Sequence, residues 1–265
     1  MVRVEDLSEG NVDDLISICS SKLLEDPVHS VGVSLKRAWL LRMLREYGPC
    51  AKLAYYRGRP AAQVLYYPEE ADPTVAAGRK GVLVVNCVYN PVAEAQRLGI
   101  ASMLLKMVVE EARRGISCLR GEPCRFILAK AFTTGLFLSL PEFYRRCGFK
   151  PVPGSGGRLF YLPVAGEYEP LPPAGGYRPL PEDRGRALVF YSPVCQFSYS
   201  FAVEAARVVR EVAPELEVEL LNMWESPQEF LKRGGCGLVV NAKPVRSFVM
   251  DKEFREEVKR AARGR

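Results

Sequence analysis

Residues 82–114, VLVVNCVYNPVAEAQRLGIASMLLKMVVEEARR, decide the fold prediction. Residues 82–89 form an almost unbroken apolar run, which is typical of a central strand covered on both faces. A loop follows, and residues 98–114 then place apolar side chains at helical spacing. Gly99 and Ala101 stand at the start of this helix, where small residues let a ligand approach the backbone. Because first-turn amides lack intrahelical acceptors, the pattern predicts a pyrophosphate site, although a glycine that merely precedes a helix would look the same.

Shorter elements on both sides of this stretch predict an α/β domain. Before it, we expect a strand at 2–7, helices at 12–23 and 34–47, and a hairpin of residues 50–57 and 61–67. After it, we expect strands at 125–132, 149–152 and 158–164, and a short helix at 140–148 that ends in glycine. His29, in a proline-containing stretch, is expected in a surface loop.

Composition excludes several classes of protein. The chain has 265 residues, of which 48% are hydrophobic and 26% charged, so it is long enough for about two globular domains. The net charge of +6 is too mild and too spread out for a typical nucleic-acid binder. No apolar run is long enough to span a membrane, and no secretory signal opens the sequence, so we expect a cytoplasmic protein. The single histidine argues against a Ser-His-Asp triad and against most metal sites built on histidine.

Eight cysteines leave two interpretations open. Cytosolic thiols normally stay reduced, but four glutamines and five asparagines beside 26 arginines resemble a thermophile's composition. Intracellular proteins of hyperthermophiles are known to keep disulfides. Cys118 and Cys124, which flank a turn-like segment, are therefore either a bridge or two unrelated small residues.

A proline-rich segment divides the chain. Residues 163–181, PVAGEYEPLPPAGGYRPLP, hold six prolines and three glycines, a composition typical of an extended, semi-rigid connection. We therefore expect one domain at 1–162, a linker at 163–185 and a second α/β domain at 186–265. The second domain shows the order strand, helix, strand, helix, strand, strand, helix.

The first domain carries two motifs of one family. Gln96, Gly99 and Ala101 match a phosphate-loop pattern Gln/Arg-x-x-Gly-x-Gly/Ala, and about forty residues on, the segment 143–149 (FYRRCGF) matches aromatic-Tyr-x-x-x-Gly-Phe. Together with the order of strands and helices, these motifs make residues 1–162 resemble the GNAT family of N-acetyltransferases. The resemblance implies a mixed-sheet α/β fold, acetyl-CoA as cosubstrate and an amine-bearing acceptor of unknown identity.

The resemblance also implies roles for single residues. The backbone of Cys87, Val88 and Tyr89 would pair with the pantetheine arm of acetyl-CoA. Tyr144 would protonate the departing thiolate, or else only pack beside the cofactor. The pyrophosphate would be held, chiefly by main-chain amides, by Gln96, Arg97, Leu98, Gly99, Ile100, Ala101 and Ser102.

Several features depart from the family pattern. The loop after Pro91 is two residues longer than usual, and the segment before Tyr144 is longer too. The central strand has no carboxylate to act as general base, because Asn86 cannot take a proton; a water chain, Glu94 and Glu142 remain open as alternatives. A non-catalytic protein that binds CoA, or that senses thiols or redox state, is therefore the alternative function.

The second domain resembles the thioredoxin fold, and its pairing with a GNAT domain is similar to proteins with a YoaP-like domain. At the redox-motif position stands Cys195-Gln-Phe-Ser198, in which serine replaces the second cysteine. The resemblance places Cys236 opposite Cys195, as a thiol site, a disulfide, a soft-metal site or two unrelated residues. The oligomeric state, monomer or homodimer, also stays open.

Overall fold

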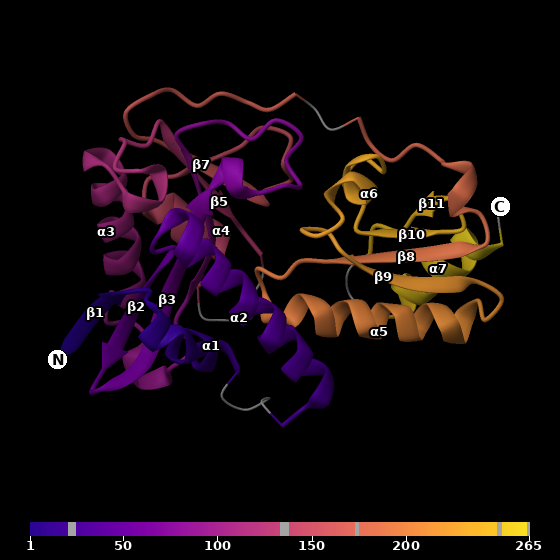
Figure 1. Cartoon of the computed structure of the whole chain (residues 1–265), viewed down its shortest axis with the longest axis horizontal. Coiled ribbons are helices and arrows are strands. Elements are labelled where there is room, and N and C mark those ends of the chain that lie inside the picture. Colours follow the sequence, from indigo (N-terminus) through magenta and orange to yellow (C-terminus); the bar gives the residue numbers. More distant parts are fainter. Residues whose placement is uncertain (21–24, 133–137, 173–174, 248–250, 264–265) are drawn as a thin grey trace. The chain divides into compact units, whose positions relative to one another are not determined.

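The computed structural model describes residues 1–20, 25–132, 138–172, 175–247 and 251–263. The chain forms two compact units (Figure 1). The N-terminal unit comprises Met1–Lys22, Arg37–Asp72 and Ala77–Pro170, and the C-terminal unit comprises Leu23–Lys36, Pro73–Ala76 and Leu171–Arg265. The proline-rich segment is therefore shared between the units. Within the described residues, no helix is long and apolar enough to cross a membrane.

The N-terminal unit is built on one mixed sheet. Its seven strands follow the order β1-β2-β3-β4-β5-β7-β6, and only β4 and β5 run parallel. The strands are β1 (Val2–Asp6), β2 (Ala51–Tyr56), β3 (Arg59–Pro68), β4 (Val82–Tyr89), β5 (Phe126–Lys130), β6 (Lys150–Pro151) and β7 (Leu159–Pro163). The predicted central strand lies in the middle of this sheet, and the expected α/β class with a mixed sheet is confirmed.

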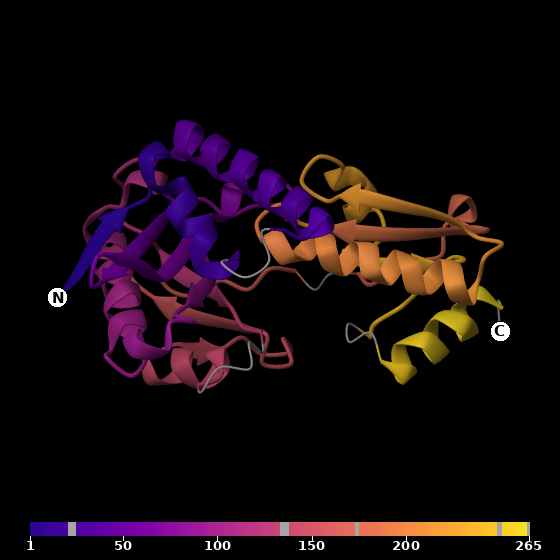
Figure 2. The same cartoon turned by 90° about the horizontal axis from the view of Figure 1, so that it is seen from below.

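Helices cover both faces of this sheet. They are α1 (Val12–Ser20), α2 (Pro27–Tyr47), α3 (Ile100–Arg114) and α4 (Leu140–Arg146). On β3, Tyr66 belongs to the core cluster beneath α3, whereas the next residue, Tyr67, meets Trp39 of α2 edge-on. Because successive side chains of a strand point to opposite faces, α2 and α3 lie on opposite sides of the sheet (Figure 2).

Helix α2 begins seven residues earlier than the sequence predicts. Asp26 caps it, because its side-chain oxygen accepts from the main-chain N–H groups of Val28 and His29 at 2.8 and 2.9 Å. Pro27 occupies the first helical position, where a missing N–H costs nothing. The expectation of a surface loop at His29 is therefore wrong: the residue is helical and buried, its ring lies 4.9 Å from that of Phe197, and burial lowers its pKa.

The two parallel strands separate beyond their first four pairs. Residues Val82–Val85 of β4 pair with Phe126–Ala129 of β5, and the later residues of β4 have no partner in β5. On the other edge, Leu65 of β3 faces Cys87 and Tyr66 faces Val85, so Asn86 is an extra, bulged residue. The bulge lies at the point where the separation begins. It leaves the last residues of β4 open toward β5.

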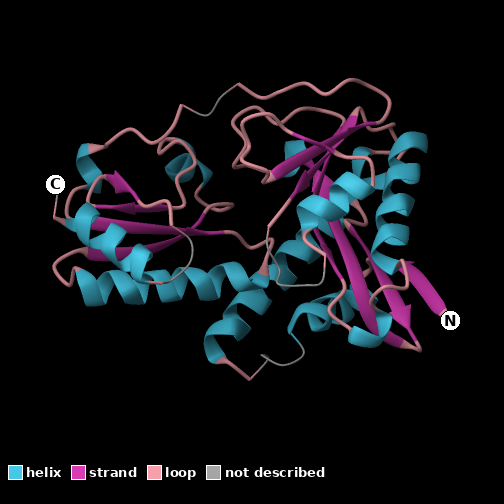
Figure 3. Ribbon diagram, turned by 180° about the vertical axis from the view of Figure 1, so that it is seen from behind, coloured by secondary structure: helices cyan, strands magenta, loops and turns pink. Residues whose placement is uncertain are grey.

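The C-terminal unit contains a four-stranded sheet of order β11-β10-β8-β9. Figure 3 draws its strands in magenta. Strands β8 and β9 are parallel, and the other neighbours are antiparallel. The elements are β8 (Arg186–Tyr191), α5 (Gln196–Val212), β9 (Glu217–Asn222), α6 (Pro227–Leu231), β10 (Leu238–Val240), β11 (Lys243–Pro244) and α7 (Lys252–Ala262). Ala187 and Val189 of β8 pack with α5 and α7, whereas Phe190 meets Phe230 of α6 on the opposite face. The predicted order of elements is confirmed, and residues 248–250 of the predicted last strand lie outside the described residues.

A buried ion pair holds the later part of the proline-rich segment in this unit. The Asp183 carboxylate accepts from the Arg233 guanidinium, with 3.0 Å from Nε to each oxygen, and both side chains are excluded from solvent. The Tyr177 hydroxyl donates to the same carboxylate at 3.0 Å. At Gly234, where φ is +63°, a Cβ atom would overlap the Gly176 carbonyl oxygen. The chain from Gly176 to Asp183 is thus an integral part of the C-terminal unit.

Candidate active site

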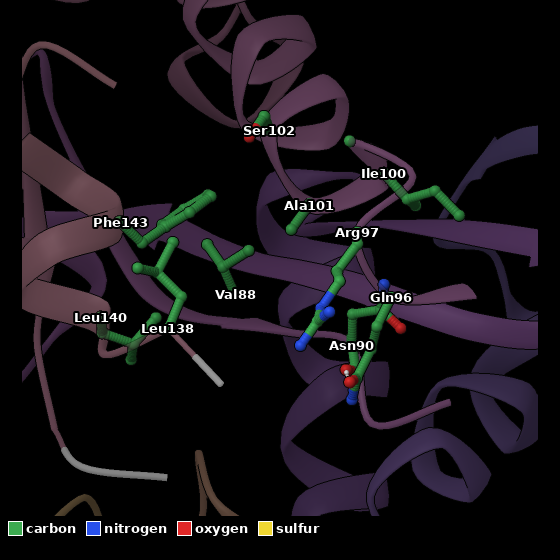
Figure 4. Close-up of a pocket in the computed structure, with 11 residues that line it drawn as sticks. Val88, Asn90, Gln96, Arg97, Ile100, Ala101, Ser102, Leu138, Leu140 and Phe143 are labelled. Atoms are coloured by element: carbon green, nitrogen blue, oxygen red, sulfur yellow. Dashed lines mark hydrogen bonds between the residues drawn. The ribbon is translucent and has the colours of Figure 1, made fainter. Parts of the chain in front are cut away.

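A pocket of about 200 Å³ lies where β4 ends and α3 begins (Figure 4). Three parts of the chain line it: the end of β4 with its loop, the first turn of α3, and the segment that enters α4. Its lining residues are Val88, Asn90, Gln96, Arg97, Gly99, Ile100, Ala101, Ser102, Leu138, Leu140 and Phe143. Asn90, Gln96 and Arg97 gather at one end, and Val88, Leu138, Leu140 and Phe143 gather at the other (Figure 4). The pocket thus joins a polar end to an apolar end.

The first turn of α3 presents unused hydrogen-bond donors to the pocket. Within the described chain, no acceptor meets the main-chain N–H groups of Gly99, Ile100, Ala101 and Ser102, and the turn has no acidic residue. Gly99 precedes the helix at φ +74°, and a Cβ atom there would have no neighbour within 4 Å. The unpaired amides and the helix dipole together favour an anion at this point.

The loop that follows β4 is folded back on itself. The Asn90 side-chain Nδ2 donates to the Ala95 carbonyl oxygen at 2.9 Å, across the 3-10 turn Ala93–Ala95. The Gln96 side-chain Nε2 donates to the Asn90 carbonyl oxygen at 3.2 Å. These two bonds close the loop into a turn, and Gly99 stands directly before α3.

Most of the residues predicted to bind the cofactor line this one pocket. They are Val88, Gln96, Arg97, Gly99, Ile100, Ala101 and Ser102. Cys87, Tyr89 and Leu98 are outside the lining. Val88 faces the core beneath α3, so the alternation of a strand turns Cys87 and Tyr89 to the other face; their predicted role is through the main chain. Leu98 is 54% exposed.

Sequence reasoning missed four lining residues: Asn90, Leu138, Leu140 and Phe143. Phe143 is the aromatic residue of the 143–149 motif, so its position was available as a signal. Leu138 and Leu140 approach the pocket only through the tertiary fold, because more than thirty residues separate them from Ala101. No local pattern marks them.

The predicted catalytic residue Tyr144 is outside the pocket lining and fully buried in the core, although Phe143, the residue before it, lines the pocket. Its ring centre is 5.6 Å from that of Phe143, 5.5 Å from that of Phe149 and 5.8 Å from that of Phe160. Its hydroxyl donates to the Lys130 carbonyl oxygen at 3.4 Å, which is long for a hydrogen bond. Burial raises the pKa of Tyr144 well above its ordinary value. The hydroxyl therefore keeps its proton at neutral pH.

Charged groups meet at the end of β5, beside the carbonyl that Tyr144 contacts. The Lys130 Nζ lies 2.7 Å from the Tyr67 hydroxyl oxygen and 3.6 Å from the Asp72 carboxylate, which accepts from Tyr67 at 3.2 Å. Tyr67 and Asp72 are buried, whereas the Lys130 side chain is 44% exposed. Sequence reasoning did not find this cluster, because Lys130 is 63 residues away from Tyr67 in the sequence.

The carboxylates considered as general base differ in their surroundings. Glu142 is bound by Arg146 at 2.9 Å and lies 3.9 Å from Arg145, so its charge is already compensated. Glu94 is exposed on the 3-10 turn of the pocket loop. Asn86 is the bulged residue of β4.

The predicted thiol residues lie near the same end of one strand. Cys195 is exposed and directly precedes α5, four residues after β8 ends. The Phe190 N–H donates to the Gly237 carbonyl oxygen, which brings Cys236 level with the end of β8. Cys236 is half-buried, its thiol donates to the Leu238 carbonyl oxygen at 3.1 Å, and burial raises its pKa. Within the described residues, no group of three or more His, Cys, Asp or Glu is arranged to hold a metal ion.

All eight cysteines are free thiols in the structure, including Cys118 and Cys124. Both of these are buried in the N-terminal unit, and the Cys124 thiol donates to the Phe126 carbonyl oxygen at 3.0 Å. Burial raises the pKa of both thiols, that of Cys124 to about 12. The structure thus shows the unbridged alternative.

No protein-family model and no curated protein matches the chain. Among solved structures, a GNAT family acetyltransferase from Brucella melitensis in complex with acetyl-CoA is similar at 14% identity and TM-score 0.41, over 64% of this chain and 92% of its own. A PaiA N-acetyltransferase from Thermoplasma acidophilum in complex with coenzyme A is similar at 11% identity and TM-score 0.43. The match covers 62% of this chain and 99% of that protein's chain. The ribosomal-protein-S18-alanine N-acetyltransferase from Escherichia coli is similar at 14% identity and TM-score 0.41. The match covers 64% of this chain and 99% of that protein's chain.

Proposed function

We propose that the protein is a GNAT-type N-acetyltransferase that uses acetyl-CoA to acetylate an amine. The observation that carries this proposal is the pocket itself: unused amides of Gly99–Ser102 stand beside the open end of β4. A diphosphate fits the amides, and an extended arm with amide groups fits the unpaired strand edge and the apolar residues opposite it. Acetyl-CoA carries both parts in that order, with its thioester at the far end of the arm.

The chemistry follows from the groups at the strand separation. An acceptor amine attacks the thioester carbon, a C–N bond forms, and the C–S bond breaks. The amine gives up a proton, and the departing sulfur takes one. Tyr144 is the donor to sulfur in this proposal, because its proton is retained at neutral pH and its long bond to the Lys130 carbonyl is easily exchanged.

The general base that would receive the amine's proton is not assigned to a single residue. No carboxylate lies on β4, and Glu142 forms ion pairs with Arg145 and Arg146. The exposed Glu94, or water, is left for this role. The missing carboxylate also favours a second candidate, a protein that binds CoA without transferring the acetyl group.

We further propose that the C-terminal unit is a thioredoxin-like module with Cys195 as its thiol. Supporting this are the strand order β11-β10-β8-β9, the parallel β8 and β9 joined through α5, and the place of Cys195 directly before α5. A thiolate at a helix N-terminus is stabilised by the dipole. With Ser198 in place of a resolving cysteine, the module would form mixed disulfides only.

An acetylation assay distinguishes the two candidates. The full chain is incubated with acetyl-CoA and a panel of amines (amino acids, polyamines, aminoglycosides and peptides with free N-termini), and release of free CoA thiol is followed together with the mass of the acceptor. Transfer to at least one amine, absent without protein, supports the enzyme. Tight acetyl-CoA binding with no transfer to any class supports the non-catalytic alternative.

A further inference from the structure

One polar atom at the pocket has no hydrogen-bond partner within the described part of the chain. It is Oδ1 of Asn90, which is shielded from solvent. Asn90 directly follows β4 and lines the pocket between the strand end and the phosphate loop. A buried acceptor without a donor costs free energy, so such an atom at a pocket points to a donor on the ligand.

The orientation of the Asn90 amide is fixed by its neighbours. Nδ2 donates to the Ala95 carbonyl oxygen at 2.9 Å, so turning the amide over would set two oxygens against each other. The main-chain oxygen of Asn90 is engaged separately, by Gln96 Nε2. Figure 4 shows Asn90 and Gln96 side by side at the polar end of the pocket. The side chain therefore holds an unpartnered acceptor, Oδ1, at the pocket.

The chemistry of the atom selects which part of the ligand it contacts. A diphosphate has only acceptors at neutral pH and would be repelled by an amide oxygen. The arm of acyl-CoA carries two secondary amides and a hydroxyl, all of which are donors. Asn90 lies at the exit of β4, beyond Val88, which is the side from which the arm would reach the strand.

We propose that Asn90 Oδ1 accepts a hydrogen bond from an N–H or O–H of the pantetheine arm, and so distinguishes acyl-CoA from ligands that carry only its nucleotide and phosphates. This inference rests on the proposed function, because it assigns one contact within the same site.

The test compares two ligands on the full chain by calorimetry: coenzyme A, and 3′-phosphoadenosine 5′-diphosphate, which keeps the diphosphate and lacks the arm. Asn90→Ala should weaken binding of coenzyme A about tenfold and leave the affinity for the nucleotide without the arm within twofold, because only coenzyme A loses a hydrogen bond. Equal weakening of both ligands, or no weakening of either, would overturn the assignment. The first result would make Asn90 a support of the loop, through its bond to Ala95.

A second variant controls for a change in the loop conformation, because Asn90→Ala also removes the hydrogen bond to the Ala95 carbonyl oxygen. Asn90→Asp keeps the side-chain oxygen and removes the donor to Ala95, so the ratio of the two affinities should stay within about twofold of the parent's, whatever its effect on the loop. A ratio that falls as far as in Asn90→Ala overturns the proposal. A parent protein that binds no coenzyme A at all would overturn the proposed function with it, whereas a parent that binds coenzyme A with a ratio insensitive to Asn90 overturns this inference alone.

Discussion

At the scale of single residues, Tyr144 carries the catalytic part of the proposal. Tyr144→Phe keeps the ring among its aromatic neighbours and removes the proton donor. We expect turnover to fall about 100-fold with acetyl-CoA affinity nearly unchanged, since the hydroxyl acts on the departing sulfur. Its long bond to Lys130 stabilises the fold by at most about 1 kcal/mol, so the variant should fold normally.

Steady-state kinetics together with calorimetry check this expectation. Tyr161→Phe is the matched control, because Tyr161 stacks on Tyr168 and has no role in the proposed proton transfer. If the Tyr144→Phe enzyme turns over as fast as the parent, Tyr144 has a packing role only.

Also at the residue scale, the buried Cys124 should make stability fall in mild alkali. In the unfolded chain its thiol ionises near pH 8.5, whereas burial raises the folded pKa to about 12. The thiol's contribution to the free energy of unfolding is therefore complete below pH 8.5 and is lost as pH rises from 8.5 toward 12. The loss approaches about 1.4 kcal/mol per pH unit.

Urea denaturation at pH 8, 9 and 10 measures this loss. Cys124→Ser keeps a donor for the Phe126 carbonyl oxygen but does not titrate in this range, so its stability should fall less steeply than the parent's. Parallel curves for the parent and Cys124→Ser would show that burial does not shift the Cys124 thiol.

At the scale of elements, substitutions at the start of α3 can separate the effect of a side chain's charge on acetyl-CoA binding from the effect of its size. A side chain at Gly99 meets open space but has to adopt φ +74°, so Gly99→Ala, Gly99→Gln and Gly99→Glu should each lose about 1 kcal/mol of stability. Gly99→Ala should bind acetyl-CoA within a few-fold of the parent. Gly99→Gln should bind more weakly because of its bulk, and Gly99→Glu should lose binding by more than 100-fold because a carboxylate would face the diphosphate. Equal affinity of the Gln and Glu variants would contradict an anion site at this helix.

The elements also show how far the sequence predicts the fold. The apolar run at 82–89 and the motif at Gln96–Ala101 predict the central strand and most of the pocket, because both signals are local. The start of α2 was missed because Pro27 looks like a breaker, although Asp26 before it is a capping signal. Leu138 and the Lys130 cluster could not be predicted, because only the tertiary fold brings their partners together.

At the scale of the whole molecule, the eight cysteines differ in exposure. Cys195 alone is exposed, and the others are half-buried or buried. Cys195 should therefore react first with iodoacetamide in the native protein, and Cys195→Ser should remove the fast phase of labelling. Peptide mass spectrometry over a time course identifies the labelled site. Faster labelling of any other cysteine, or none at Cys195, would leave the C-terminal unit without its proposed thiol function.

Calorimetric titration of the full chain with acetyl-CoA, run beside Gly99→Glu, tests the central claim most directly. The claim is that the pocket between the end of β4 and the start of α3 binds acetyl-CoA through the unused amides of Gly99–Ser102. The predicted result is saturable binding at one site per chain in the parent, reduced more than 100-fold in the folded Gly99→Glu protein. No saturable binding to the parent, or equal affinity in both proteins, would contradict the account.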